Sequence, residues 1–181
     1  MLDSLTPTPA PDFSHPLGLM RACHQKILDH CQQLIDLCDY LEKHSEDEAA
    51  LQSCAKIYRY FNLSASAHHQ DEEQDLFPLL LAQKNISNDT TSLIARLKLD
   101  HFNIDKIWLK LEPVLAHQDL ITLAIMKNQA QALLQAYESH IELENNHLLP
   151  IAETSLESEN LQQLGSNMKK RREEIFTVSS S

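Results

Sequence analysis

Apolar residues spaced alternately three and four positions apart are the feature that most constrains this fold. The spacing runs without interruption through residues 20–41, 51–79, 94–115 and 123–147. Side chains spaced in this way lie on one face of an α-helix, and in a bundle that face packs against partner helices. Only 2 glycines occur in 181 residues, and no long stretch alternates apolar and polar residues as a half-buried strand does. We therefore predict an all-α fold, an up-down-up-down four-helix bundle with a short C-terminal fifth helix.

Prolines, polar turns and capping residues set the expected ends of the helices. The predicted helices span residues 16–44, 48–78, 89–115, 119–150 and 158–174. The second helix ends at Pro78 or one turn later, and the third bends or ends early at Pro113. Asn88 or Asp89 is the expected N-cap of the third helix, and Pro150 is expected to end the fourth. Because the connections are short, consecutive helices should be antiparallel.

These helices divide the chain into three predicted parts. Residues 1–14 are expected to form a disordered leader, because they are proline-rich and lack the basic start and apolar stretch of a signal peptide. Residues 15–152 form the bundle, and residues 153–181 form a short helix and tail. No apolar stretch approaches the roughly 20 residues that a membrane span requires.

Charge and cysteine content limit the partners and the cell compartment that we expect for this protein. The formal net charge is −11, and an acidic surface repels nucleic-acid phosphates and anionic lipids, so we expect neither as a partner. The basic run 169–172 is predicted to be a solvated helix end. The four cysteines show no Cys-x-x-Cys spacing, and Cys31 and Cys38 fall on the apolar face of the first helix. We expect a cytoplasmic protein with reduced cysteines.

Six polar residues interrupt the four apolar faces, and they form the candidate functional site. Each face contains a histidine near the same depth and two faces also contain a glutamate, giving His24, His68, Glu72, His101, His140 and Glu144. Burying an unpaired carboxylate costs several kcal/mol, so these groups need a compensating partner. At a rise of about 1.5 Å per residue, all six lie roughly 9–18 Å from the same end of the bundle. We therefore expect them to converge on one site.

The second and fourth helices carry the same motif. His68-x3-Glu72 is followed by Leu-Phe-Pro, and His140-x3-Glu144 by Leu-Leu-Pro, at matching distances. Residues four apart lie on one helix face, so each histidine can bind one metal ion while its glutamate reaches a second. Imidazole and carboxylate ligands without thiolate favour iron or manganese over structural zinc. A ferritin-like site is disfavoured, because it needs two Glu-x-x-His motifs and this chain has one, Glu144 to His147.

These motifs resemble the hemerythrin family, in the stand-alone bacterial form known as the hemerythrin HHE cation-binding domain. Residues 68–78 read His-His-Gln-Asp-Glu-Glu-Gln-Asp-Leu-Phe-Pro and are similar to the family segment His-His-x-x-Glu-Glu-x-x-Leu-Phe-Pro. The resemblance continues in residues 140–150 and around His24 and His101, and it covers roughly residues 15–152. It implies two non-haem iron ions, bridged by two carboxylates and an oxo or hydroxo group.

The resemblance also implies which residues bind these ions. Terminal ligands would be His24, His68, His101 and His140, with Glu72 and Glu144 as bridges. Oxygen-carrying members have a second histidine four residues after the third-helix ligand, where this chain has Asp105. The departure leaves about two open coordination positions, and we include Asp105 in the predicted metal site, either as a ligand or as the partner of a ligand histidine. His69 and Glu73 lie one position off the apolar faces and are expected to be outer partners of the ligands or surface groups.

The expected function is binding or sensing of a small diatomic, with O2 first and NO second. No catalytic residue is predicted, and we favour binding over catalysis. The alternatives are a di-iron redox enzyme that turns over peroxide or NO, and a donor of iron for the repair of iron centres. A third alternative is an iron-dependent regulatory or scaffold module, although the sequence shows no segment that identifies a protein partner.

Overall fold

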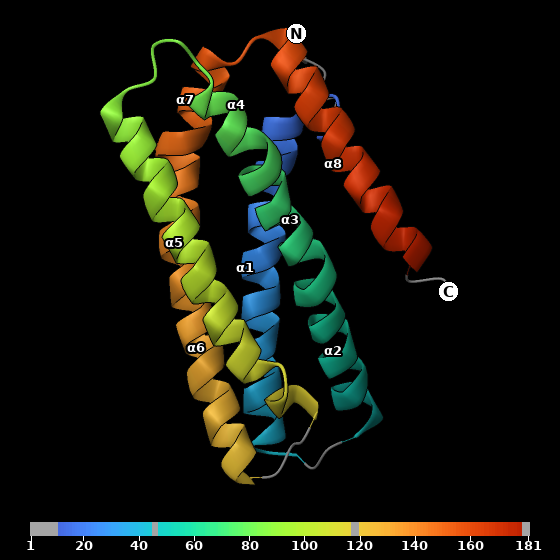
Figure 1. Ribbon diagram of the computed structural model, residues 1–181. Helices are drawn as coiled ribbons and strands as arrows, with labels where there is room; N and C mark the ends of the chain where they lie inside the picture. The colour runs from blue at the N-terminus through green and yellow to red at the C-terminus, as the bar shows by residue number, and fades with distance from the viewer. Residues whose placement is uncertain (1–10, 45–46, 117–119, 179–181) are drawn as a thin grey trace, which may run out of the picture.

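The computed structural model describes residues 11–44, 47–116 and 120–178, which form four long helical rods and a fifth helix packed against them (Figure 1). In chain order the elements are α1 (Pro16–Leu41), α2 (Glu48–Arg59), η1 (Tyr60–Ala65), α3 (Ser66–Gln70), η2 (Asp71–Leu76), α4 (Phe77–Leu81), α5 (Asn88–Leu111), η3 (Val114–Ala116), α6 (Leu120–Leu143), η4 (Glu144–Leu148), α7 (Leu149–Ser155) and α8 (Ser158–Val178). α2 to α4 form one continuous rod and α6 to α7 another, because η1, η2 and η4 are π-helical stretches within them. Consecutive rods are antiparallel, and the described residues contain no strand. The predicted all-α bundle with a fifth helix is confirmed.

Several predicted helix ends need correction. The N-cap of α5 is Ser87 and not the predicted Asn88 or Asp89. The Ser87 hydroxyl accepts a hydrogen bond from the Thr90 amide at 3.0 Å. The early end before Pro113 is confirmed, since α5 stops at Leu111. The fourth rod does not end at Pro150 but continues to Ser155.

The π-helical stretches explain why proline does not end the fourth rod. The carbonyl of Glu72 accepts a hydrogen bond from the amide of Phe77, and that of Glu144 from Leu149, in each case five residues back. A proline inside an α-helix collides with the carbonyl four residues earlier, and the wider turn before each of these prolines relieves that collision. Each of these two turns therefore lets its helix pass a proline and also contains the glutamate of a His-x3-Glu motif.

The apolar core consists of two clusters with a polar layer between them. One cluster contains Ile27, Ile104 and Trp108 and fills the end of the bundle near η3, and the other contains Met20 and Leu97 and fills the opposite end. The candidate site residues fall between the two clusters along every rod. Both ends of the polar layer are therefore sealed by close-packed apolar side chains, which exclude water from it.

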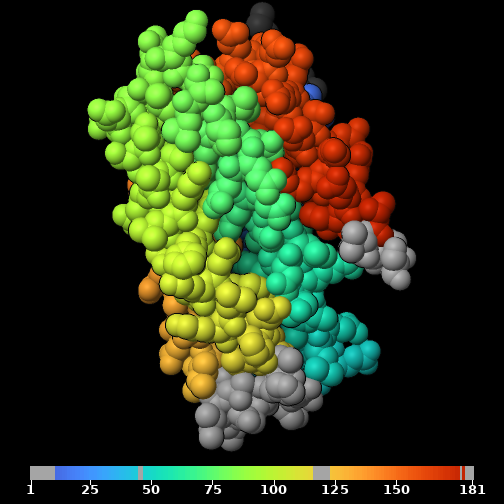
Figure 2. All heavy atoms as spheres, in the orientation of Figure 1, coloured from blue at the N-terminus to red at the C-terminus, as the bar shows by residue number. Residues whose placement is uncertain are grey.

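α8 lies diagonally along one edge of the bundle, as the red surface in Figure 2 shows, and contacts α1 and η2. The prediction that residues 169–172 form a solvated helix end is wrong for the two arginines. Arg171 and Arg172 pair with the fully buried carboxylate of Asp71, and Arg171 also donates to Asp75 at 2.7 Å. The two lysines of the run stay largely exposed. The arginines therefore fasten α8 to the helix that carries Glu72.

The start of the described chain also packs against α8. A Cβ atom at Gly165 would overlap the backbone carbonyl of Phe13, so glycine permits this close approach. Residues 1–10 of the predicted leader lie outside the described residues. Within residues 11–44, 47–116 and 120–178, no helix combines the length and apolar character needed to cross a membrane.

Candidate metal centre

The six candidate residues project into the polar layer from all four rods. They are His24 on α1, His68 on α3, Glu72 on η2, His101 on α5, His140 on α6 and Glu144 on η4. Each is at most 2% exposed. Such complete burial of two carboxylates and four imidazoles requires close electrostatic partners, because unpaired charges are costly in an apolar interior.

The residues form two groups of four that share both glutamates. One group is His24, His68, Glu72 and Glu144, and the other is His101, His140, Glu72 and Glu144, with the potential ligand atoms of each group within 4.8 Å of one another. Oxygen atoms of Glu72 lie 3.3 Å from His68 Nε2 and 3.2 Å from His101 Nε2, so this carboxylate reaches both groups. Glu144 does the same, with distances of 3.1 Å to His24 Nε2 and 3.3 Å to His140 Nε2. Each group could hold a cation, and both carboxylates belong to the two groups.

The hydrogen bonding of these atoms fits metal ligands better than a self-sufficient polar core. Among the described residues, every buried side-chain nitrogen or oxygen that lacks a hydrogen-bond partner belongs to this layer, on His24, His68, His69, Glu72, His140 or Glu144. Buried polar atoms in proteins are nearly always paired, so a local concentration of exceptions points to a group that these atoms hold in common. The Nε2 atoms of His101 and His140 lie 3.0 Å apart. Ligands at right angles on one ion are separated by about 3 Å when the metal–nitrogen bonds are about 2.1 Å.

Outer hydrogen bonds orient two of the imidazoles. Nδ1 of His24 lies 2.8 Å from Asn145 Oδ1, and Nδ1 of His101 lies 2.7 Å from Glu73 Oε1. A donor hydrogen on Nδ1 leaves the Nε2 lone pair directed into the layer, which is how proteins commonly fix a histidine ligand. Glu73 is therefore an outer partner, one of the two alternatives expected for it. Asn145 was not identified from the sequence, where its position directly after Glu144 is the only signal.

The shared carboxylates control the charges of the histidines. Burial lowers the pKa of His24, but the nearby carboxylates of Glu144 and Glu72 outweigh it and raise that pKa to about 10. Burial also opposes protonation of His101, and its carboxylate neighbours nevertheless raise its pKa to about 9. Burial dominates at His68 and lowers its pKa to about 4. Burial alone would raise the pKa of Glu72, but the surrounding imidazoles hold it well below its usual range. Without metal, protons on His24 and His101 thus neutralise the two carboxylates.

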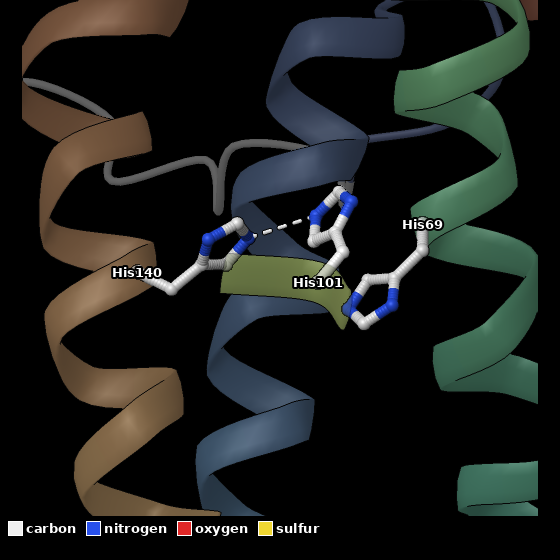
Figure 3. A group of neighbouring side chains, drawn as sticks. All are labelled: His69, His101 and His140. Carbon is white, nitrogen blue, oxygen red and sulfur yellow. Dashed lines mark hydrogen bonds between the residues drawn. The ribbon is translucent and has the colours of Figure 1, made fainter. Parts of the chain in front are cut away.

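Asp105 and His69 lie at the edge of this layer. Asp105 belongs to neither group of four, and its side chain is 67% exposed, with Oδ1 3.9 Å from Nδ1 of His69. His69 is buried and its ring stacks on that of His101, with centroids 4.0 Å apart and planes 14° apart. Figure 3 shows the rings of His69, His101 and His140 side by side between their helices. No pattern in the sequence ranks His69 above Asp105, because His69 is one position off the apolar face.

A pocket of about 270 Å³ leads from the surface to this side of the layer. It opens between α5 and the η1–α3 segment, on the face drawn in Figure 2, and its lining includes Asp105, His69, Asn62 and Tyr137. Asn62 Oδ1 accepts a hydrogen bond from the indole N–H of Trp108 at 3.0 Å, which fixes one wall. A molecule of a few atoms that enters the pocket therefore meets His69 before it meets the ligand groups.

Comparison with known proteins gives the same picture as the geometry. Residues 15–152 match the family described as the hemerythrin HHE cation binding domain. An uncharacterized protein of Haemophilus influenzae is 32% identical over 173 residues, which cover 93% of this chain and 96% of that relative. Both similarities span all four rods that supply the polar layer.

Proposed function

Since the chain belongs to the hemerythrin HHE cation-binding family, we propose that it holds two non-haem iron ions and uses them to bind or sense a small diatomic molecule. His24 and His68 would hold one ion, His101 and His140 the other, and Glu72 and Glu144 would bridge the two. The observation that carries this proposal is the pair of four-residue groups that share both buried carboxylates.

The donor set favours iron among the common metal ions. Imidazole with carboxylate suits iron, manganese and zinc, whereas calcium and magnesium prefer oxygen ligands alone. Two groups that share two carboxylates can hold a pair of divalent or trivalent ions. Iron and manganese are redox-active in such a set and zinc is not, and we propose iron because the resemblance of the His-x3-Glu motifs to the hemerythrin family implies it. An oxo or hydroxo group would complete the bridge. Bound ferrous ions would supply reversible one-electron chemistry and open coordination positions for O2 or, as the second choice, NO.

The chain's own residues would set the selectivity of such a site. The apolar clusters on both sides of the layer, represented by Leu76 and Ile104, exclude water and larger polar molecules. The outer partners Asn145 and Glu73 hold two imidazoles in fixed orientations, so little reorganisation is needed when a ligand binds. These features support a small uncharged ligand that enters a dry, rigid site.

A redox enzyme acting on peroxide or NO, or an iron donor, is the second candidate. The specific observation in its favour is Asp105, whose side chain is 67% exposed and lies beside His69 in the lining of the pocket. A carboxylate in that position can exchange protons with water, which turnover of peroxide requires and simple binding does not. Steady consumption of NO or peroxide with a supplied reductant, lost in His140→Ala, would favour this candidate.

The proposal is tested by loading the full chain with ferrous iron without air and measuring iron per chain and the visible spectrum. Two irons per chain, with a charge-transfer band that appears in oxygen and vanishes on degassing, are expected for reversible binding. His147→Ala is a matched control, because His147 is exposed on η4 and belongs to neither group. Iron content below one per chain in the unaltered protein would refute the di-iron centre. Irreversible oxidation at two irons per chain would instead transfer support to the second candidate.

A further inference from the structure

We propose that the outer face of α5 is a surface through which two copies of this chain associate, with their α5 helices antiparallel about a twofold axis. α5 lies along an outer edge of the bundle, so one side of it is free of the other rods (Figure 1). The residues involved lie outside both groups of four in the polar layer, and association through them is therefore independent of metal binding.

α5 has a second apolar side in addition to the one that packs in the core. Ala95, Leu99, Phe102 and Leu109 are all exposed, and the last three are 54%, 54% and 63% exposed. Their spacings of four, three and seven residues place them in one line along the helix, which we call the outer line. A helix that is apolar on two sides is expected to be covered on both.

The size of this surface fits a weak dimer. Three large side chains with these exposed fractions present roughly 300 Å² of apolar area, a patch size that is often functional on a monomer. Tyr58 on α2 extends the patch, since it is 43% exposed and its ring lies 6.5 Å from that of Trp108 on α5. Two copies that cover the patch and its polar surroundings would bury about 1,000 Å² in total, the lower limit for a specific interface. We therefore expect a dissociation constant on the order of 10 µM.

The outer line matches itself when one copy is reversed. Position 102 is the midpoint between Ala95 and Leu109, and it lies within half a residue of the midpoint between Leu99 and Lys106. In an antiparallel pair centred there, the small Ala95 of each copy faces the large Leu109 of the other, and the two Phe102 rings meet at the axis. A twofold interface requires such a match because each of its contacts occurs twice. The paired aromatic rings add to the gain from buried area.

Lys106 is the polar member of the outer line, and its position is compatible with an interface. Its Nζ lies 4.0 Å from the centroid of the Phe102 ring, a cation–π contact. The aliphatic part of a lysine packs on apolar groups while its ammonium stays at the edge in water. In the antiparallel pair that part would cover Leu99 of the other copy.

Charged residues beside the outer line favour a second copy as the partner. Lys98 and Asp105 are seven residues apart and therefore lie on the same edge of the line, with a midpoint again within half a residue of position 102. Equivalent edges face each other in an antiparallel helix pair, so Lys98 of each copy would face Asp105 of the other. Both side chains are exposed, and within the described part of the chain Lys98 forms no ion pair. Two reciprocal ion pairs would thus fix the register.

The overall charge of α5 removes an obstacle to association. The whole chain has a formal net charge of −11, so average surfaces of two copies repel each other. α5 instead carries four basic and three acidic residues, which are Arg96, Lys98, Lys106, Lys110, Asp89, Asp100 and Asp105. Two copies of this helix can therefore meet without that repulsion.

The proposed interface lies beside the pocket that leads to the polar layer. Asp105 and Leu109 both line this pocket, and both lie on the outer side of α5. Lys98 of one copy would therefore sit at the edge of the other copy's pocket, where it would compete with His69 for the Asp105 carboxylate.

The test is the mass of the full chain in solution, measured by sedimentation velocity and light scattering at concentrations from well below to well above about 10 µM. The unaltered chain should change from monomer to dimer within this range. Phe102→Glu should weaken the dimer about tenfold or more, because it removes the contact at the axis and places two carboxylates there. Leu51→Glu is the matched control, since Leu51 is 49% exposed on α2 and is not part of the outer line. It should leave association unchanged.

An exchange of charges tests the register. Lys98→Glu alone and Asp105→Lys alone should each weaken the dimer about tenfold, because like charges then face each other across the interface. The two changes combined restore opposite charges and should return the dissociation constant to within about threefold of the unaltered value. Circular dichroism should show that every variant keeps its helices.

Three results would overturn the inference. The first is a chain that stays monomeric over the whole concentration range, and the second is a dimer that Phe102→Glu does not weaken. The third is a combined charge variant that associates as weakly as the two single ones, which would exclude the antiparallel register.

Discussion

Glu72 and Glu144 should affect metal binding more than any other single residue of the site, because each belongs to both groups of four. Replacing Glu144 by glutamine keeps the size of the side chain but removes the charge that both ions would share. We expect iron content to fall from two to fewer than one per chain, since the loss of a shared ligand weakens both ions by about tenfold or more each. Iron analysis after anaerobic gel filtration measures this directly.

A matched change outside the site provides the control for that experiment. Glu142→Gln removes a carboxylate from the same helix, but this side chain is exposed and belongs to neither group. Its iron content should remain at two. If Glu144→Gln also kept two irons, the assignment of Glu144 as a bridge would have to be abandoned.

Protons and metal compete for His24 and His101. Their pKa values, about 10 and about 9, exceed the ordinary value of 6.5, so both are protonated in the metal-free protein near pH 7. This stabilisation of the metal-free fold is complete below about pH 6.5 and is lost as pH rises through 9 to 10. Metal ions need the deprotonated rings, so metal affinity should rise with pH, with about two protons released near pH 7 per chain that binds both ions. Calorimetric titration in two buffers of different ionisation enthalpy gives the proton count, and a count near zero would contradict this charge assignment.

At the scale of elements, the helices were predictable from the sequence but several of their details were not. Apolar spacing predicts all four rods, and the shared His-x3-Glu motif predicts which faces converge. Apolar spacing cannot predict a π turn, because a single widened turn leaves the spacing almost unchanged. The sequence therefore predicts a helix end at Pro150, where the structure has none. The roles of His69 and Arg172 depend on which helix lies opposite, and that information is absent from the spacing along one helix.

The attachment of α8 offers a test at this scale. Burial raises the pKa of the Asp71 carboxyl, and the guanidinium groups of Arg172 and Arg171 oppose that rise. Replacing both arginines by methionine leaves this carboxylate buried without a cation, which should destabilise the fold by about 3–5 kcal/mol. Urea denaturation measures the change. Adding Asp71→Asn to the double variant should recover a large part of the loss, and no recovery would show that the arginines act through packing instead.

The two glycines provide a paired test of how α8 docks. Gly165→Ala places a methyl group against the backbone of Phe13, and backbone cannot move aside as a flexible side chain can. We expect a loss of about 1–3 kcal/mol, measured as a lower midpoint of thermal unfolding. Gly18→Ala is the control, since its Cβ would meet only the Cβ of Pro11 at 3.4 Å. Within a helix that change should be neutral or stabilising by up to about 1 kcal/mol, and equal effects at both sites would contradict the docking geometry.

At the scale of the whole molecule, one polar layer lies between two apolar clusters, and the side chains of each cluster pack against one another. The metal-free protein can therefore fold, because both ends of the bundle are packed and the layer is neutralised by its own protons. The layer nevertheless joins all four rods, so an ion bound there resists their separation. Function and stability are linked in this fold because the ligands lie at its centre.

This linkage gives a quantitative expectation for metal removal. An ion that binds only the folded state adds about 2.7 kcal/mol when its free concentration is a hundred times its dissociation constant. For a chain of this size that gain corresponds to a rise of about 5–10 °C in the unfolding midpoint. Anaerobic melting curves at graded ferrous iron, with chelator-treated protein as the reference, measure the rise. The Glu144→Gln variant should need about tenfold or more free iron for the same rise. A midpoint in the unaltered protein that is equally insensitive to iron would show that the metal does not bind within the layer that joins the rods.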